Sequence, residues 1–193
     1  APRAYQRPAS IMKKLLAAAF LSLLSLTAVA EKADSLKPAV IDYDSLDVDQ
    51  VTGANIVTGN VILTRGTLVL KADRAVVNET PEGYLTVTLT AANGKLTTFR
   101  QKRDGGPNLW VEGQAQRIVY EERSELVRLY SNAMVKELED SRMTNQITGP
   151  FISYDNRREV ATVRNDASGE SKVGGGRGTL ILAPKRAGSG GGE

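Results

Sequence analysis

Four aspartates, Asp42, Asp44, Asp47 and Asp49, form the densest group of titratable side chains in this sequence of 193 residues. If Asp42 and Asp44 alternate along one strand, their carboxylates share a face, as the two catalytic carboxylates of a glycosidase do. Acidic side chains are mostly solvent-exposed, so we favour a solvated strand face. The spacing also lacks the glycine and the terminal glutamate of a calcium loop. We therefore predict neither a catalytic pair nor a metal site here.

Histidine and cysteine are both missing from the sequence. Their absence excludes Ser-His-Asp triads, thiol catalysis, disulfide frameworks and the usual zinc sites. Paired carboxylates are then the only common catalytic chemistry left, and the four aspartates form their densest group. We predict a protein that is not an enzyme, that needs no cofactor, and that is held together by sheet pairing and core burial.

An uncharged apolar run extends from Leu15 to Ala30 and follows Met12, Lys13 and Lys14. This order is typical of a secretory signal peptide, and the small residues at 28–30 fit the peptidase. The run is short for a membrane span of about 20 residues, so we favour cleavage after Ala30 over an uncleaved anchor. Residues 1–11 precede the methionine, and we interpret them as a misassigned translation start.

Removing residues 1–30 changes the charge balance of the chain. That segment holds four of the 25 basic residues and none of the 22 acidic ones, so the remainder carries 21 basic and 22 acidic residues. Residues 31–170 alone carry 17 basic and 21 acidic residues, a net charge of −4. A nucleic-acid-binding domain usually has a basic face. We therefore expect no nucleic-acid partner, although the whole-chain pI is 9.2.

The segment from Ile56 to Val77 has the pattern of a β-hairpin. Apolar residues alternate with others before and after Arg65-Gly66, and a period of two with a glycine turn predicts two antiparallel strands. On the second strand one face is apolar and the other carries Lys71 and Asp73. That division is expected of a sheet with one dry face and one wet face.

Similar short β units recur downstream at irregular spacing. Residues 115–120 align with 72–77, residues 129–135 resemble 56–61 around a shared asparagine, and 147–154 form a third copy. Such recurrence predicts strands stacked as a solenoid or a rolled sandwich. One domain over residues 31–164 accounts for them. Residues 165–193 are rich in glycine and serine, and we predict a flexible tail.

Several motifs occur in a fixed order: IDYDSLDVDQVTGANIVTGNV, GTLVLKADRAVV, GKLTTFRQ, VEGQAQRIVYEE and ITGPFISYD. With the signal peptide, this series resembles the OstA-like family of lipopolysaccharide-transport proteins over roughly residues 39–163. The resemblance implies an all-β fold, an open and slightly twisted β-jellyroll built from repeated antiparallel strands. It also implies a periplasmic protein that carries lipopolysaccharide from the inner to the outer membrane.

The same resemblance implies an apolar interior that holds the acyl chains of lipid A. The expected inward-facing lining consists of Ile41, Val61, Leu63, Leu68, Leu70, Phe99, Ile118 and Tyr120. Each of these residue types is equally common in a hydrophobic core that binds no ligand. Glu122 lies on the same strand face as Tyr120, where the family can place an apolar residue, and this puts the lining at that end of the strand in question.

An open roll leaves unpaired strands at its two ends, and such edges can add strands from partners. We expect one edge near Ala39, Ile41 and Tyr43 and the other near Val160 and Val163. The resemblance implies three partners for these edges: an inner-membrane export complex, an outer-membrane translocon and further copies of the chain, joined head to tail.

Two alternatives stay open. One is another member of the same pathway, such as the membrane-tethered partner, which an uncleaved apolar anchor would indicate. The other is a periplasmic glycan-binding β-sandwich. That class usually needs an exposed aromatic platform, whereas aromatic residues make up 5% of the chain and Trp110 is the single tryptophan.

Overall fold

The computed structural model describes residues 34–92 and 94–184. The expected signal peptide at residues 1–30 and the end of the expected tail therefore lie outside the described residues. Within the described ranges the chain forms one short 3-10 helix, η1 (Asp34–Leu36), and twelve strands. In chain order these are β1 (Val40–Asp42), β2 (Ser45–Asp49), β3 (Ala54–Arg65), β4 (Leu68–Glu79), β5 (Leu85–Thr90), β6 (Thr97–Lys102), β7 (Leu109–Ala115), β8 (Arg117–Glu121), β9 (Leu126–Glu139), β10 (Arg142–Asp155), β11 (Val160–Arg164) and β12 (Thr179–Leu182).

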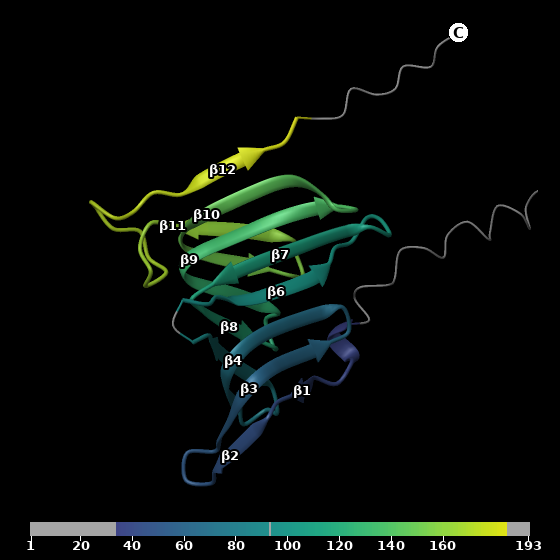
Figure 1. Cartoon of the computed structure of the whole chain (residues 1–193), viewed down its shortest axis with the longest axis vertical. Coiled ribbons are helices and arrows are strands. Elements are labelled where there is room, and N and C mark those ends of the chain that lie inside the picture. The colour runs from purple at the N-terminus through teal and green to yellow at the C-terminus, as the bar shows by residue number, and fades with distance from the viewer. Residues whose placement is uncertain (1–33, 93, 185–193) are drawn as a thin grey trace, which may run out of the picture. The chain divides into compact units, whose positions relative to one another are not determined.

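All twelve strands belong to one antiparallel sheet that divides into two arms (Figure 1). The four long strands β3, β4, β9 and β10 run through both arms, and each pairs with different short strands along its two halves. We call the half that contains β1, β6, β7 and β12 the β7 arm. We call the half that contains β2, β5, β8 and β11 the β8 arm.

The long strands bend between the arms at two β-bulges. Gly59 and Asn60 form the bulge in β3, and Ser131 and Asn132 form the one in β9. All four residues have positive φ, at 79°, 46°, 62° and 52° respectively. Bulges of this kind bend a strand sharply, and glycine and asparagine adopt positive φ most readily. The line of bulges is therefore the hinge between the two arms.

The chain contains the same six-strand unit twice. The pairing of β1 and β2 with β3 is repeated by β7 and β8 with β9, and the pairing of β4 with β5 and β6 is repeated by β10 with β11 and β12. Even the junctions correspond: Asp44 N–H donates to the bulge carbonyl of Gly59, and Gln116 N–H donates to that of Ser131. The repeat expected for residues 129–135 and 56–61 is thus confirmed, whereas the expected match of 115–120 with 72–77 is wrong. Residues 115–120 correspond to 43–48, because β8 is the counterpart of β2 and β4 has its counterpart in β10.

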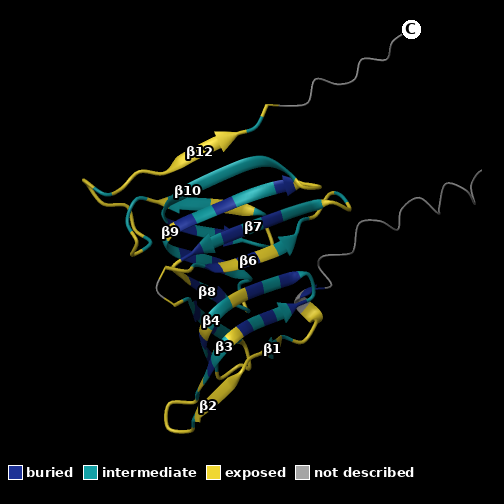
Figure 2. Cartoon of the chain, viewed as in Figure 1, coloured by how far each residue is buried: buried dark blue, intermediate teal, exposed yellow. Residues whose placement is uncertain are grey.

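Inside the molecule, the two copies join where β5 and β6 of the first copy pair with β8 and β7 of the second. The inner faces of both arms bury their side chains in one cluster, and burial alternates along β3 and β4 (Figure 2). This alternation confirms the hairpin pattern read from the sequence.

Four short strands mark the ends of the sheet. Among the described residues, β1 and β2 pair only with β3, and β11 and β12 pair only with β10, so each has one edge without a described partner. The sequence placed residues 179–182 within a flexible tail, whereas they form β12 against β10. That expectation was wrong because residues 180–182 are an isolated apolar triplet. Their local sequence does not show that one half of β10 has backbone groups in need of hydrogen-bond partners.

Candidate functional site

The space between the two arms gathers the side chains that the sequence placed on an inner face. Seven of the eight expected residues are at most 3% exposed, and the eighth, Ile41, is partly buried against the same cluster. They come from five strands: β1, β3, β4, β6 and β8. The interior is therefore a single apolar core, and it is filled by these side chains.

Contacts across this core join the arms. The rings of Phe99, from the β7 arm, and Tyr154, from the β8 arm, have centroids 6.1 Å apart. Phe99 also covers Gly113 on the neighbouring strand, where an added Cβ would lie 2.2 Å from Phe99 Cε1. The glycine of the Val111-Glu112-Gly113 motif thus makes room for the ring.

At the side opposite the hinge, the arms end in a mouth that is bridged by charged residues. Arg65, the last residue of β3, places Nη1 2.7 Å from Glu122 Oε1, just beyond β8. Arg65 also donates from Nη1 to the Tyr120 hydroxyl at 3.2 Å and from Nε to the Lys37 carbonyl at 3.1 Å. Glu122 Oε2 accepts a hydrogen bond from Leu85 N–H at 2.6 Å. We call the Arg65–Glu122 ion pair the first clasp.

A second ion pair bridges the mouth nearby. Arg103, in the loop after β6, places Nη2 3.0 Å from Glu159 Oε2 and Nη1 3.2 Å from Glu137 Oε2. Glu159 lies in the turn between β10 and β11, and its Oε1 accepts from Asp104 N–H at 2.6 Å. We call the Arg103–Glu159 ion pair the second clasp, because it also joins the β7 arm to the β8 arm.

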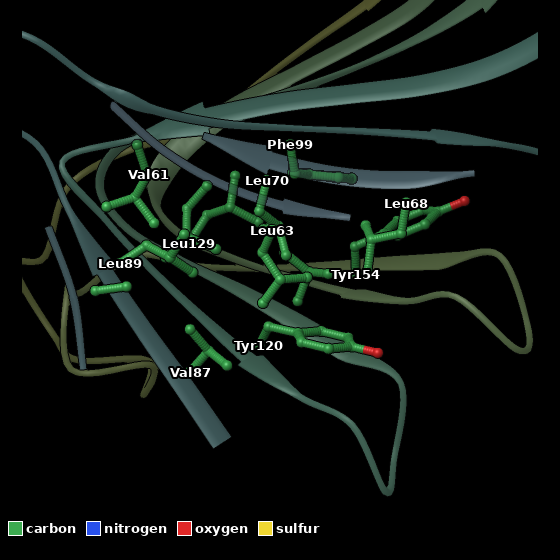
Figure 3. Close-up of a cluster of buried hydrophobic side chains, with 14 of the residues drawn as sticks. Val61, Leu63, Leu68, Leu70, Val87, Leu89, Phe99, Tyr120, Leu129 and Tyr154 are labelled. Carbon is green, nitrogen blue, oxygen red and sulfur yellow. The ribbon is translucent and has the colours of Figure 1, made fainter. Parts of the chain in front are cut away.

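Two buried tyrosines point toward this mouth. Figure 3 shows the hydroxyl groups of Tyr120 and Tyr154 on the same side of the core, away from Val61. Burial raises the pKa of Tyr120, and burial followed by the charge of Glu159 raises the pKa of Tyr154. Both phenols therefore stay protonated at neutral pH.

A cavity of about 780 Å³ lies at the mouth. Its lining mixes the clasp residues Arg65, Glu122 and Glu159 with apolar groups such as Val111 and Tyr154. The cavity thus connects the charged rim with the apolar core. An amphiphile, with one apolar and one charged part, matches this combination of linings.

The aspartate cluster does not place Asp42 and Asp44 on one strand. The strand breaks after Asp42, and Asp44 accepts a hydrogen bond from Asn60 Nδ2 at 2.9 Å. Asp49 caps the following turn, where hydrogen bonds from Thr52 and Val51 lower its pKa. No group of three potential metal ligands occurs among the described residues. The four aspartates therefore lie along a solvated edge.

The expected edge residues lie on or beside the end strands. Ile41 is in β1, Val160 and Val163 are in β11, while Ala39 and Tyr43 flank β1. Eight large apolar residues are exposed on or beside these edges: Val40, Tyr43, Leu46, Val48, Val160, Leu180, Ile181 and Leu182. Two further edge strands, β2 and β12, were missed by the sequence reasoning. The alternation of Leu46 and Val48 with aspartates is a signal that predicts β2.

Sequence reasoning also missed the two clasps. Arg65 continues the inward alternation of Val61 and Leu63, and Glu122 continues that of Ile118 and Tyr120. An arginine and a glutamate on inward faces need a partner of opposite charge. That requirement was the available signal for the first clasp, whereas nothing local predicts the second.

Residues 40–160 match the family model described as "LptA/(LptD N-terminal domain) LPS transport protein". The chain belongs to this family. Lipopolysaccharide export system protein LptA of Haemophilus influenzae Rd is 29% identical over 176 residues, which cover 91% of this chain and 94% of that protein. The protein of the same name from Escherichia coli K12 is 33% identical over 134 residues, covering 69% of this chain and 71% of that protein.

The fold has a counterpart among solved structures. LptH of Pseudomonas aeruginosa, described as the LptA-homologous periplasmic component of the lipopolysaccharide transport device, superposes with a TM-score of 0.65 at 22% identity. The match covers 78% of this chain and 99% of that chain. The family and the β-jellyroll fold expected from the sequence are thereby confirmed.

Proposed function

We propose that this protein binds lipopolysaccharide between its two arms and carries it across the periplasm, without catalysis, from an inner-membrane export complex to an outer-membrane translocon. Membership of a family of lipopolysaccharide transport proteins supports the ligand. The observation that carries the mechanism is the single apolar core between two hinged arms.

The acyl chains of lipid A need such an interior. Exposing them to water costs about 0.8 kcal/mol per methylene, so lipid cannot cross an aqueous compartment at useful rates unaided. In this mechanism the arms part at the hinge, and inner side chains such as Leu63, Leu70 and Phe99 exchange contacts with each other for contacts with acyl chains. Burial is non-directional, so lipid can slide along the interior without being released.

Photo-crosslinking in cells tests this binding site. A crosslinking residue at Phe99 or Leu70 points into the interior, while one at Lys71, next to Leu70 on β4, points outward. We expect lipopolysaccharide adducts at Phe99 and Leu70 and none at Lys71. Adducts confined to Lys71 would rule out the interior as the binding site.

The internal duplication suggests how copies of this chain join head to tail. β5 and β6 of the first unit pair with β8 and β7, and their counterparts β11 and β12 have no such partner among the described residues. The counterparts of β8 and β7 are β2 and β1. We therefore propose that β11 and β12 of one copy pair with β2 and β1 of the next, which covers the apolar residues exposed at both edges.

The duplication also predicts the register of this contact. Leu89 pairs with Ile118 inside the molecule, and the residues at the equivalent positions are Val163 and Leu46. Phe99 pairs with Gly113, and the equivalents are Leu180 and Ile41. In the proposed assembly, Val163 therefore faces Leu46 of the next copy, and Leu180 faces Ile41.

Engineered disulfides test the register cleanly because the chain has no cysteine. Directly opposite residues in an antiparallel pair have Cα atoms about 4.5–5.5 Å apart, within the range that a disulfide spans. Mixing Val163→Cys with Leu46→Cys protein is expected to give a covalent dimer. Mixing Val163→Cys with Asp47→Cys serves as the control, because a shift of one residue turns the side chain to the other face. Equal yields from both mixtures would contradict the proposed register.

A further inference from the structure

We infer that Arg65 and Arg103 form a binding subsite for the anionic groups of an amphiphile, and that Glu122 and Glu159 of the β8 arm occupy this subsite while the mouth is closed. The inference rests on the proposed function, because it concerns how the bound lipid is held at the mouth. It assigns a role to charged residues that the apolar interior does not need.

The two clasps are placed where they hold the arms together. The hinge bulges at 59–60 and 131–132 lie at one side of the core, and both clasps lie at the other. Arg65 and Arg103 belong to the β7 arm, while Glu122 and Glu159 belong to the β8 arm. Parting the arms therefore separates each arginine from a glutamate.

Opening the mouth has a different energetic cost at the apolar core and at the charged rim. Apolar contacts between the arms are replaced by contacts with acyl chains, which are equally apolar, so this exchange is nearly neutral. The Arg65–Glu122 ion pair at the rim has no such replacement, whereas Arg103 keeps Glu137 of its own arm. The side chains of Arg65 and Glu122 are 10% and 15% exposed, and separating a buried pair without a new partner is strongly unfavourable. A ligand that supplies its own anion to the arginine removes this penalty.

Arginine is well suited to that exchange of partners. Its guanidinium presents a planar set of donors that matches phosphate as well as carboxylate. Arg103 Nε is buried without a hydrogen-bond partner among the described residues, so that guanidinium has a donor to spare. When the first clasp opens, Glu122 keeps the hydrogen bond that it accepts from Leu85 N–H. Arg65 keeps the hydrogen bond that it donates to the Lys37 carbonyl. The chemical class of ligand is therefore an amphiphile with phosphate groups next to its acyl chains.

Binding of fluorescent lipid A and of its dephosphorylated form to the full chain tests this subsite. Glu122→Gln releases the first clasp and keeps the arginine, whereas Arg65→Gln releases the clasp and removes the anion partner. Arg100→Gln is the matched control, because Arg100 pairs with Glu112 at 3.2 Å on the outer face of the β7 arm. Thermal unfolding checks that each variant is folded. If Arg65→Gln does not fold, Arg65→Lys, which keeps the charge, is measured as well.

A hydrogen bond to a charged group contributes about 1.5–3 kcal/mol, so we expect the wild type to prefer the phosphorylated form by about tenfold or more. Glu122→Gln and Arg100→Gln should keep this preference, and Arg65→Gln should reduce it severalfold. An unchanged preference in Arg65→Gln, or equal binding of both lipids by the wild type, would overturn the subsite. Failure of both lipids to bind the wild type would instead contradict the proposed function.

Inorganic phosphate distinguishes a lipid-coupled subsite from a general anion site. Spin labels at Lys102→Cys and Tyr84→Cys report the separation of the arms, because both positions line the mouth. We expect lipid A to lengthen this distance and inorganic phosphate alone to leave it unchanged, since phosphate brings no acyl chains to replace the core contacts. Opening by inorganic phosphate alone would overturn the coupling between anion and acyl chain.

Discussion

Arg65 Nη1 lies 2.7 Å from Glu122 Oε1, although Arg65 ends β3 in the β7 arm and Glu122 follows β8 in the β8 arm. Both continue an inward-facing alternation, so each carries its charge to the border of the apolar core, where a partner of opposite charge lowers the cost of burial. Their pairing turns two unfavourable burials into one bridge across the mouth.

Removing one partner of this bridge should destabilise the closed protein. Arg65→Met leaves Glu122 with its charge and without its cation, and the free energy of unfolding should fall by about 3 kcal/mol. Urea denaturation measures the change. The double variant Arg65→Met/Glu122→Leu removes both charges and should recover most of the lost stability. A double variant less stable than the single one would contradict this account of the pair.

The close approach of Phe99 to Gly113 predicts that the glycine cannot be replaced. Gly113→Ala places a methyl group 2.2 Å from Phe99 Cε1, and overpacking of this kind costs about 1–3 kcal/mol. Gly106→Ala is the control, because its added Cβ meets Leu109 at 3.4 Å, an ordinary contact distance. The midpoints of chemical denaturation of the two variants should differ clearly. Equal midpoints would show that the ring can move aside at little cost.

The hinge depends on positive φ at Asn132, which is 52°. Asn132→Gly should be tolerated, since glycine adopts this conformation freely, whereas Asn132→Val should lower the melting temperature because a β-branched residue is strained there. Thermal unfolding of both variants measures the difference. If Asn132→Val has the same melting temperature as the wild type, the bulge is not required for the bend.

Alkaline pH should lower the stability of the folded protein, because its two buried tyrosines resist losing their protons. Burial raises the pKa of Tyr120 and of Tyr154 above the ordinary value of 10.0, so the folded state holds these protons more tightly than the unfolded chain. The resulting stability is complete below pH 10 and is lost as the pH rises from there toward the folded pKa. Tyr154→Phe should flatten this loss in melting curves measured between pH 9 and pH 11, a window set around the ordinary tyrosine pKa of about 10. An unchanged slope would show that another group titrates.

Charge complements the proposed contact between copies. The β1–β2 edge carries the four aspartates, and Arg164 on β11 would lie diagonally from Asp47 of the next copy in the proposed register. Asp47→Arg should shorten the assemblies seen by light scattering at low salt, and Arg164→Asp in the same chain should restore them. If Arg164→Asp does not restore the assemblies at low salt, Arg164 does not lie next to Asp47 in the contact between copies.

Local pattern in the sequence predicted the long inner strands and their inward faces, but not the edge strands β2 and β12. Alternation at Val61, Leu63, Leu68 and Leu70 follows from the period of two along a strand, and each of these side chains is buried. The ordered motifs indicated the family, and the shared asparagines at 60 and 132 indicated the repeat, because glycine and asparagine favour the positive φ that a bulge requires.

Tertiary structure decided which strands meet and what closes the mouth. Pairing of β5 with β8 and of β4 with two different strands involves residues far apart in the chain, whose partners no local pattern specifies. Arg103 reaches Glu159 only because two loops meet where the arms end. Periodicity, which is local, determined from the sequence alone that the strands have an apolar inner face, and the resemblance to the family implied the β-jellyroll. The hinge, the clasps and the two complementary edges were decided by long-range pairing of the folded chain.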